Sequence, residues 1–381
     1  MNGRDKAEGA IGRGLSYLSH QVEGRGMPAA QLATDRLFHH CCSGTEARAR
    51  VLRQFGIDLG FNPADEAFSA MLALSVLPAA CLSPTAGAAL VRQVDSSRWQ
   101  HRFRFFPAVG QFAADTDCTA HAASGLSAHG AMPRHRLHAV VRELGDAAAP
   151  PATGSTERGR RPGLHPGVVM VYWDDGAEPG ATPRGRKHDP VVCANALHTM
   201  SLAAPSALTE NCHRTMAATL DYVREHLDSG RYRHGTRYYP SPDAFLHAAS
   251  RLCLHTTAHT APLTDALRTA LVQREAYLTT QEAADDPLQL ALRTIAANNL
   301  AHTHAQDERR AALVRHQRPD GSWPARPYYR LGRVPLYFGS PQLTTLFALA
   351  ALHPHNPPRH AAALPHTGQT SKALTQSEEP R

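Results

Sequence analysis

The chain of 381 residues is 42% hydrophobic and 19% charged, a composition typical of a soluble globular protein with enough apolar residues for a large core. Its formal charge of +7 comes almost wholly from scattered arginines, whereas a general nucleic-acid-binding surface needs a denser basic stripe. No apolar run reaches the roughly 20 residues of a membrane span or has the form of a signal peptide. The seven cysteines include no CxxC pair, so a cytoplasmic protein with reduced thiols and no nucleic-acid partner is expected.

Apolar spacing and capping residues predict twelve helices and very little strand. The predicted helices cover residues 8–21, 66–77, 84–94, 116–127, 132–145, 190–203, 207–226, 242–252, 262–276, 284–299, 305–317 and 341–353. Residues 102–106 and 167–173 are predicted to be short extended pieces at the rim, and residues 36–62 leave room for a further helix. One core is expected over residues 1–353, with a flexible loop near residues 147–166 and a disordered tail over residues 354–381.

A short turn motif recurs between the predicted helices. Gln317 is followed by Gly321 and Trp323, a spacing in which the glutamine amide can bond to a helix end while the indole lies across the backbone. Similar spacings return at Gln93, Ser97 and Trp99 and at His226, Gly230 and Tyr232. Recurrence of this kind indicates a repeated helix pair.

Aromatic pairs stand just before two Ser-Pro helix starts. The two copies read Tyr238-Tyr239-Pro240-Ser241-Pro242 and Tyr337-Phe338-Gly339-Ser340-Pro341. Serine is a good N-cap, and proline suits the first helical position. Both copies are therefore predicted to begin helices at equivalent places in the repeat.

Twelve helices arranged as six pairs can close into a double-walled barrel, which is an all-α (α/α)6 toroid. The helices that begin at Asp115, Asp189, Ser241 and Ser340 are candidates for the inner wall. In that arrangement their N-termini lie at one end of the barrel, together with the aromatic pairs that precede them. A pocket is expected at this end.

Two carboxylates stand at the predicted start of the helix over residues 116–127. Asp115 is placed as the N-cap, and Asp117 can point into the cavity. Burial in an apolar cavity raises the pKa of a carboxyl group, which can then stay protonated and act as an acid toward an alkene. The alternative is that Asp115 is only a cap and that Asp117 only satisfies the helix N-terminus.

These residues resemble motifs of the terpenoid cyclases and prenyltransferases with α/α barrels, over roughly residues 11–352. The Gln317, Gly321 and Trp323 turn is similar to the QW motif of squalene-hopene cyclases. Asp115-Thr116-Asp117-Cys118-Thr119-Ala120 looks like the Asp-x-Asp-Asp-Thr-Ala motif of class II cyclases. The resemblance implies a single barrel in which Asp117 protonates an alkene or epoxide, with Asp115 as its supporter. Cys118 departs from the motif, because the family has a third acid there.

Further side chains are expected around the pocket. The substrate-binding candidates are Phe105, Phe106, Cys118, Thr119, Asp189, Asn195, Tyr238, Tyr239, Tyr337 and Phe338. Aromatic faces could stabilise a developing carbocation, or the same rings could simply pack at the barrel rim. Asp189 also fits an N-cap, and Asn195 would need a partner if buried. Arg184, Arg186 and Lys187 could hold a diphosphate at the opening or lie in a solvated loop.

Three functions remain open from the sequence. The first is a class II-like terpene cyclase acting on a linear isoprenoid, which requires no cofactor and recruits magnesium only if the substrate carries a diphosphate. The second is an enzyme similar to protein prenyltransferase β subunits, whose zinc ligands include Asp and Cys two residues apart; here Asp117 and Cys118 are adjacent. The third is a non-catalytic barrel that binds a lipid or a partner chain, supported mainly by Cys118. Peripheral membrane contact is compatible with all three, and the sequence carries no signal for an oligomeric state.

Overall fold

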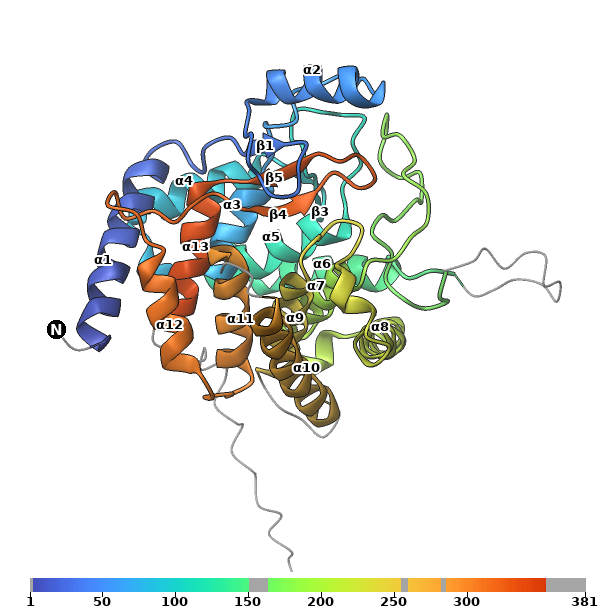
Figure 1. Cartoon of the computed structure of the whole chain (residues 1–381). Coiled ribbons are helices and arrows are strands. Elements are labelled where there is room, and N and C mark those ends of the chain that lie inside the picture. The colour runs from blue at the N-terminus through green and yellow to red at the C-terminus, as the bar shows by residue number, and fades with distance from the viewer. Residues whose placement is uncertain (1–2, 151–163, 255–259, 282–285, 354–381) are drawn as a thin grey trace, which may run out of the picture.

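The computed structural model describes residues 3–150, 164–254, 260–281 and 286–353, and these residues form a mostly helical molecule (Figure 1). Thirteen α-helices lie within the described residues. Each of the twelve predicted helices is present, with ends displaced by a few residues. The thirteenth, α2 (Gly44–Phe55), lies in the stretch that the sequence left open.

Six helices form a closed inner ring. They are α3 (Phe68–Val76), α5 (Thr116–Ala128), α7 (Pro190–Met200), α9 (Pro242–Ser250), α11 (Pro287–Asn299) and α13 (Pro341–Leu352). Each packs against the next, and α13 packs against α3. Nearly every residue of these helices is buried, as expected for helices that are surrounded by others on all sides. The predicted all-α toroid is confirmed.

A second layer of helices surrounds this ring. It consists of α1 (Gly3–Val22), α4 (Pro84–Asp95), α6 (Arg134–Asp146), α8 (Glu210–Asp228), α10 (Ala261–Thr280) and α12 (Gln306–Arg315). These helices are buried on one side: α8, for example, buries Cys212, Thr215, Thr219 and Val223 at helical spacing. Each one covers an inner helix next to it in the sequence, or α13 in the case of α1, so the two layers alternate along the chain.

The inner helices begin at the capping residues that the sequence indicated. Asp115 accepts a hydrogen bond from the Cys118 amide at 2.8 Å, and Asp189 accepts one from the Val191 amide at 3.0 Å. Ser241 and Ser340 cap α9 and α13 in the same way. These helix starts lie at one end of the ring, where the segments just before and just after them surround a common pocket.

Short strands cover this end of the ring. β1 (Gln31–Ala33), β5 (Tyr337–Gly339) and β4 (Pro327–Arg330) form an antiparallel sheet in the order β1-β5-β4. β2 (Arg98–Trp99) pairs with β3 (Arg102–Phe103). The extended piece predicted at 102–106 is therefore a strand only at its start. The piece at 167–173 makes one isolated bridge, between Val169 and Ala148.

The Gln317 turn joins the first helix of the chain to the last helix pair. The Gln317 side-chain amide donates to the carbonyl of Gly321 at 2.9 Å and to that of Ala10 in α1 at 2.8 Å. The Trp323 indole donates to the Leu313 carbonyl of α12 at 2.7 Å. The turn therefore ties α1 to the last helix pair and holds the barrel closed.

No helix in the described part of the chain is long and apolar enough to span a membrane. The predicted tail over residues 354–381 and most of the predicted loop near 147–166 lie outside the described residues.

Candidate functional site

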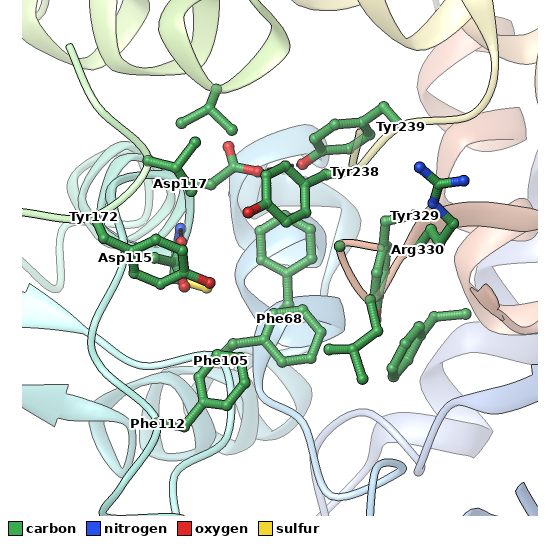
Figure 2. Close-up of a pocket in the computed structure, with 16 residues that line it drawn as sticks. Phe68, Phe105, Phe112, Asp115, Asp117, Tyr172, Tyr238, Tyr239, Tyr329 and Arg330 are labelled. Atoms are coloured by element: carbon green, nitrogen blue, oxygen red, sulfur yellow. Dashed lines mark hydrogen bonds between the residues drawn. The ribbon is translucent and has the colours of Figure 1, made fainter. Parts of the chain in front are cut away.

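A pocket lies at the N-terminal ends of the inner helices, and Figure 2 shows the side chains that line it. Its lining is largely aromatic and comes from six segments of the chain. The lining residues are Phe68, Phe105, Phe112, Asp115, Asp117, Cys118, Val171, Tyr172, Val192, Tyr238, Tyr239, Tyr329, Arg330, Leu331, Gly332 and Phe338. The space free of atoms between them is about 490 Å³, including the part open to solvent.

Asp117 is the carboxylate best placed to act on a molecule in this pocket. It lies in the first turn of α5 and is 8% exposed. Its Oδ1 accepts a hydrogen bond from the Asn195 side-chain amide at 2.9 Å, and its Oδ2 is hydrogen-bonded to the Tyr239 hydroxyl. Figure 2 shows Asp117 and Tyr239 meeting at the edge of the pocket. Asp117 is therefore held by side chains from two other inner-wall segments.

Burial raises the pKa of Asp117 to about 7. The negative charges of Asp115 and Asp189 act in the same direction, whereas the hydrogen bonds from Tyr239 and Asn195 oppose the increase. Desolvation dominates because the charged form loses its water without gaining a counter-ion in contact. A large fraction of Asp117 is consequently protonated near neutral pH.

Asp115 has a different environment. Its Oδ1 is occupied by the Cys118 amide, and its backbone pairs with Phe103. Burial raises the pKa of Asp115 to about 6, which the hydrogen bond from Cys118 partly opposes. Burial also raises the pKa of the neighbouring Cys118 thiol well above its usual value, so this thiol stays protonated. Asp115 therefore serves as a helix cap next to the acid.

A buried polar chain continues behind Asp117. The Asn195 oxygen accepts a hydrogen bond from the guanidinium of Arg251 at 3.2 Å. Arg251 lies in the short 3-10 helix η5 (Arg251–Cys253), which follows α9 directly, and is 9% exposed. Burial lowers the pKa of Arg251 to about 10, which leaves it positively charged at neutral pH. Asp117, Asn195 and Arg251 thus form a continuous hydrogen-bonded series.

A histidine lies on the other side of the acid, one turn along α5. The Nε2 atom of His121 is 4.0 Å from Oδ1 of Asp117, and its Nδ1 shares a hydrogen bond of 2.9 Å with the Ser75 hydroxyl. Burial lowers the pKa of His121 well below its usual value. The imidazole is therefore neutral and does not supply a counter-ion for the carboxylate.

Aromatic rings form the walls around the acid. Phe105 is in contact with Phe68, Tyr329 and Phe338, with ring centroids 5.5 to 5.7 Å apart. Tyr329 stacks on Phe338 at 4.9 Å. Figure 2 shows Phe68, Phe105 and Phe112 following one another along the pocket. Such a wall excludes water and presents ring faces and edges to a bound hydrocarbon.

Cationic side chains gather beside the pocket. Arg330 is one of the lining residues, and the Arg184 guanidinium lies 3.8 Å from the ring centroid of Phe112. The Lys187 ammonium lies 5.1 Å from the ring centroid of Tyr172. The pKa of Lys187 is lowered to about 8, first by burial and then by the charges of Arg237, Arg184 and Arg333. The pocket thus has carboxyl groups in its lining and a group of cations in or next to its lining.

Several residues proposed from the sequence line the pocket. They are Asp115, Asp117, Phe105, Cys118, Tyr238, Tyr239 and Phe338. Of the three basic candidates, Arg184 and Lys187 lie against the lining residues Phe112 and Tyr172, whereas Arg186 is exposed and faces Asp174 at 3.8 Å.

Other candidates point elsewhere, for local reasons. Tyr337 packs with Phe38 because neighbouring residues of β5 face opposite sides of the sheet, which leaves only Phe338 toward the pocket. Phe106 packs against Phe112, with centroids 4.8 Å apart. The Thr119 hydroxyl accepts a hydrogen bond from the Phe103 amide at 3.0 Å.

Asp189 and Asn195 also lie outside the lining. Asp189 caps α7, the role that the sequence alternative gave it. Asn195 contacts Asp117 from behind rather than facing the pocket. Both therefore support the site without reaching its open space.

The sequence analysis missed the strand β4 and the residues after it. Tyr329, Arg330, Leu331 and Gly332 form one wall of the pocket, although they fell between predicted helices. The signal was present, since Tyr328 and Tyr329 are a third aromatic pair. That pair is followed by no Ser-Pro start, so the repeat pattern did not reveal it.

The described residues contain no group of three or more His, Cys, Asp or Glu side chains arranged to hold a metal ion. No protein-family model matches the chain.

Known structures share the arrangement of the helices. The type II terpene cyclase MstE from Scytonema aligns with 92% of this chain and 97% of its own, with a TM-score of 0.55 and 12% identity. The chain has the fold of the type II terpene cyclases. A protein from Actinoplanes aligns with 91% of this chain and 98% of its own, with a TM-score of 0.54 and 17% identity. The fold that the sequence motifs implied is thereby confirmed.

Part of the chain is also similar in sequence to a curated protein. Drimenol cyclase drtB from Aspergillus calidoustus is 32% identical over 187 residues, which make up 49% of this chain. The match spans only 31% of the length of drtB. Within the cyclase fold described here, the pocket that contains Asp117 lies at the end of the barrel where the inner helices begin.

Proposed function

We propose that the chain is a class II-like terpene cyclase, which protonates a double bond of a linear isoprenoid and lets the carbocation close rings inside the pocket. The observation that carries the proposal is the environment of Asp117, a buried carboxyl group in an aromatic pocket with two fixed hydrogen-bonding partners. Burial favours the protonated acid at rest, and the oriented partners stabilise the carboxylate as the proton leaves.

The proposed reaction needs only the chain's own residues for its first step. The O–H bond of Asp117 breaks as its proton forms a C–H bond with one alkene carbon, and the π electrons leave a cation on the other carbon. A second double bond of the substrate attacks this cation and closes a ring. Aromatic rings such as Phe105, Tyr329 and Phe338 can stabilise the positive charge. Loss of a proton from carbon completes an isomerisation, whereas capture of water gives an alcohol.

The names of the relatives support a linear isoprenoid as substrate. Variants of MstE were solved with geranylgeranyl dihydroxybenzoate as substrate and with merosterolic acid A as product, and drtB is named a drimenol cyclase. We propose for this chain an isoprenoid with an anionic head, either a diphosphate or a carboxylate. The support is the group of cations beside the pocket, where the charges of Arg184, Arg237 and Arg333 lower the pKa of Lys187.

Product analysis tests the protonation step. Pure protein is incubated, with and without magnesium, with linear prenyl diphosphates, prenylated aromatic acids and squalene, and extracts are examined by mass spectrometry. A cyclic product is expected from at least one substrate, and Asp117→Asn is expected to abolish it. Asp115→Asn is the matched control because asparagine caps a helix as well as aspartate does, so part of the activity should remain.

Two results would count against the proposal. Cyclic product formed by Asp117→Asn would remove the proposed acid. No turnover of any substrate, together with an isoprenoid that co-purifies with the protein, would favour a binding barrel instead.

The anionic head is tested separately by comparing farnesyl diphosphate with farnesol. Arg237→Gln and Lys187→Met are expected to raise KM for the diphosphate at least about tenfold, since each removes a charged contact with an anion. The same variants should leave the turnover of farnesol, if any, unchanged. Equal effects on both substrates would contradict a role in binding the head group.

A further inference from the structure

Arg251 differs from the other buried arginines of the described chain. The others each pair with at least one carboxylate: Arg102 with Glu143 and Asp175, Arg293 with Asp243, and Arg309 with Glu275. Arg251 is equally buried, but the partner of its guanidinium is the neutral side chain of Asn195. A buried charge without a carboxylate in contact is costly, so its place beside the acid calls for a reason.

The contact with Arg251 decides which way the Asn195 amide faces. A guanidinium has only donors, so the atom of Asn195 that meets it at 3.2 Å must be the oxygen. The amide nitrogen then faces Asp117 and donates to Oδ1 at 2.9 Å. The N–H of Asn195 can only donate, and it donates better to the carbonyl oxygen of a protonated carboxyl group than to the oxygen that carries the proton. The Tyr239 hydroxyl at Oδ2 can accept as well as donate. The acidic proton of Asp117 is therefore favoured on Oδ2.

We infer that Arg251 is a positioning residue for the acid: it fixes the Asn195 amide as a donor to Oδ1 of Asp117, and so directs the acidic proton to Oδ2, on the side of Tyr239. Both Asp117 and Tyr239 line the pocket, whereas Asn195 does not. The proton is thus kept on the substrate side. The catalytic meaning of this inference rests on the proposed function, whereas the orientation of the Asn195 amide does not depend on it.

Arg251 also supplies positive charge as the proton leaves. The nearby acids Asp115 and Asp189 both disfavour the carboxylate form of Asp117. The nearby histidines are neutral, since burial lowers the pKa of His121 well below its usual value and that of His247 to about 3.

The phenols and thiols around the acid carry no charge either. Burial raises the pKa values of Tyr239, Tyr328, Cys118 and Cys193 above their usual ranges. Of the described groups that face Asp117 from α5, α7, α9, η5 and β4, Arg251 is therefore the one that carries a positive charge. Its fixed charge, transmitted through Asn195, stabilises the carboxylate without any rearrangement.

The test compares Arg251→Met with Arg251→Lys, and uses Arg293→Met as the control for loss of a buried arginine elsewhere in the barrel. Removing the charge is expected to raise the pKa of Asp117, so the alkaline limb of the kcat/KM profile should move to higher pH by about one unit or more. The weaker acid should lower kcat at least about tenfold with KM changed less than about threefold. In Arg251→Lys both the position of the alkaline limb and kcat should lie closer to the wild type. In Arg293→Met neither quantity should change.

A second readout needs no turnover. The infrared band of the protonated Asp117 carboxyl group, identified by subtracting the spectrum of Asp117→Asn, is titrated in the wild type and in Arg251→Met. A shift of its midpoint to higher pH is expected. If no substrate is turned over but the midpoint shifts, the proposed function fails and the inference stands. If Asp117 is required for turnover but the midpoint and the alkaline limb are unchanged, the inference is overturned.

A variant at the other end of the contact covers the case in which Arg251→Met does not fold. Asn195→Leu removes the link between Arg251 and Asp117 and is close in size. It should raise the midpoint of the Asp117 titration in the same direction. An unchanged midpoint in a folded Asn195→Leu protein would overturn the inference by itself.

Discussion

Replacing Tyr239 by phenylalanine removes one hydroxyl group from the surroundings of Asp117 and leaves the ring in place. The ring is buried and packs against Tyr328 with centroids 5.3 Å apart, so Tyr239→Phe creates little empty space. The hydroxyl is hydrogen-bonded to Oδ2 and lowers the pKa of Asp117 against the larger effect of burial. Its loss should therefore raise that pKa further.

The size of the effect follows from the strength of such a bond. A hydrogen bond to a charged group contributes roughly 1.5–3 kcal/mol, and one pKa unit corresponds to about 1.36 kcal/mol. The pKa of Asp117, about 7 in the intact protein, should rise by about one to two units. Activity requires the protonated acid, so it is present below this pKa and is lost above it. The alkaline limb should move to higher pH, while kcat on the plateau falls by up to about 100-fold because the acid is weaker.

Initial rates of product formation at constant ionic strength from pH 5 to pH 10 provide the assay. Tyr232→Phe is the matched control, because Tyr232 is buried and stacks on Phe245 at 5.9 Å, away from the pocket lining. Tyr232→Phe should leave the alkaline limb of the pH profile unchanged. A limb that stays in place in Tyr239→Phe, or moves to lower pH, would refute the role given to this hydroxyl.

Three predictions concern the stability of the fold. As pH rises from about 4 to 7, Asp117→Asn should become more stable than the wild type, by up to about 4 kcal/mol for a pKa raised by about three units. Urea unfolding at pH 4 and pH 8 measures the difference in unfolding free energy between the two proteins. An equal difference at both pH values would contradict the prediction. Gly321→Ala should destabilise by roughly 1–3 kcal/mol, because φ is +89° and the new Cβ would lie 2.5 Å from the Arg13 carbonyl oxygen, whereas Gly87→Ala, with nothing within 4 Å, should not. Cys118→Asp buries a further carboxyl group, so its melting temperature should fall more at pH 8 than at pH 5.

Much of the architecture could be predicted because it depends on local chemistry. The starts of α5, α7, α9 and α13 carry Asp or Ser caps, and a cap acts through hydrogen bonds within its own turn. The inner helices are mostly apolar, which indicates burial in any fold. Asp117 was placed in the pocket for the same reason, since it stands two residues after a cap.

The remaining parts of the site depend on contacts between distant segments. Gly332 and its neighbours reach the pocket because β4 pairs with β5, whose own register is set by β1 near the N-terminus. Arg251 meets Asn195 across 56 positions of the chain, and nothing in the local sequence marks this arginine as a partner of the acid. The orientation of Tyr337 away from the pocket likewise follows from the strand, which the aromatic pair alone did not predict.

The closure of the ring also sets an order of events during synthesis. Asp117 emerges from the ribosome about 200 residues before Tyr329, a delay of roughly ten to forty seconds at usual rates of translation. Through this interval the acid has no opposite wall, and α1 has no Gln317 to bind the Ala10 carbonyl. The nascent chain therefore exposes mostly apolar inner helices until its last helix pair is made. Such a chain should depend on chaperones more than its final stability suggests, and a chain stopped before α13 should aggregate rather than retain a partial activity.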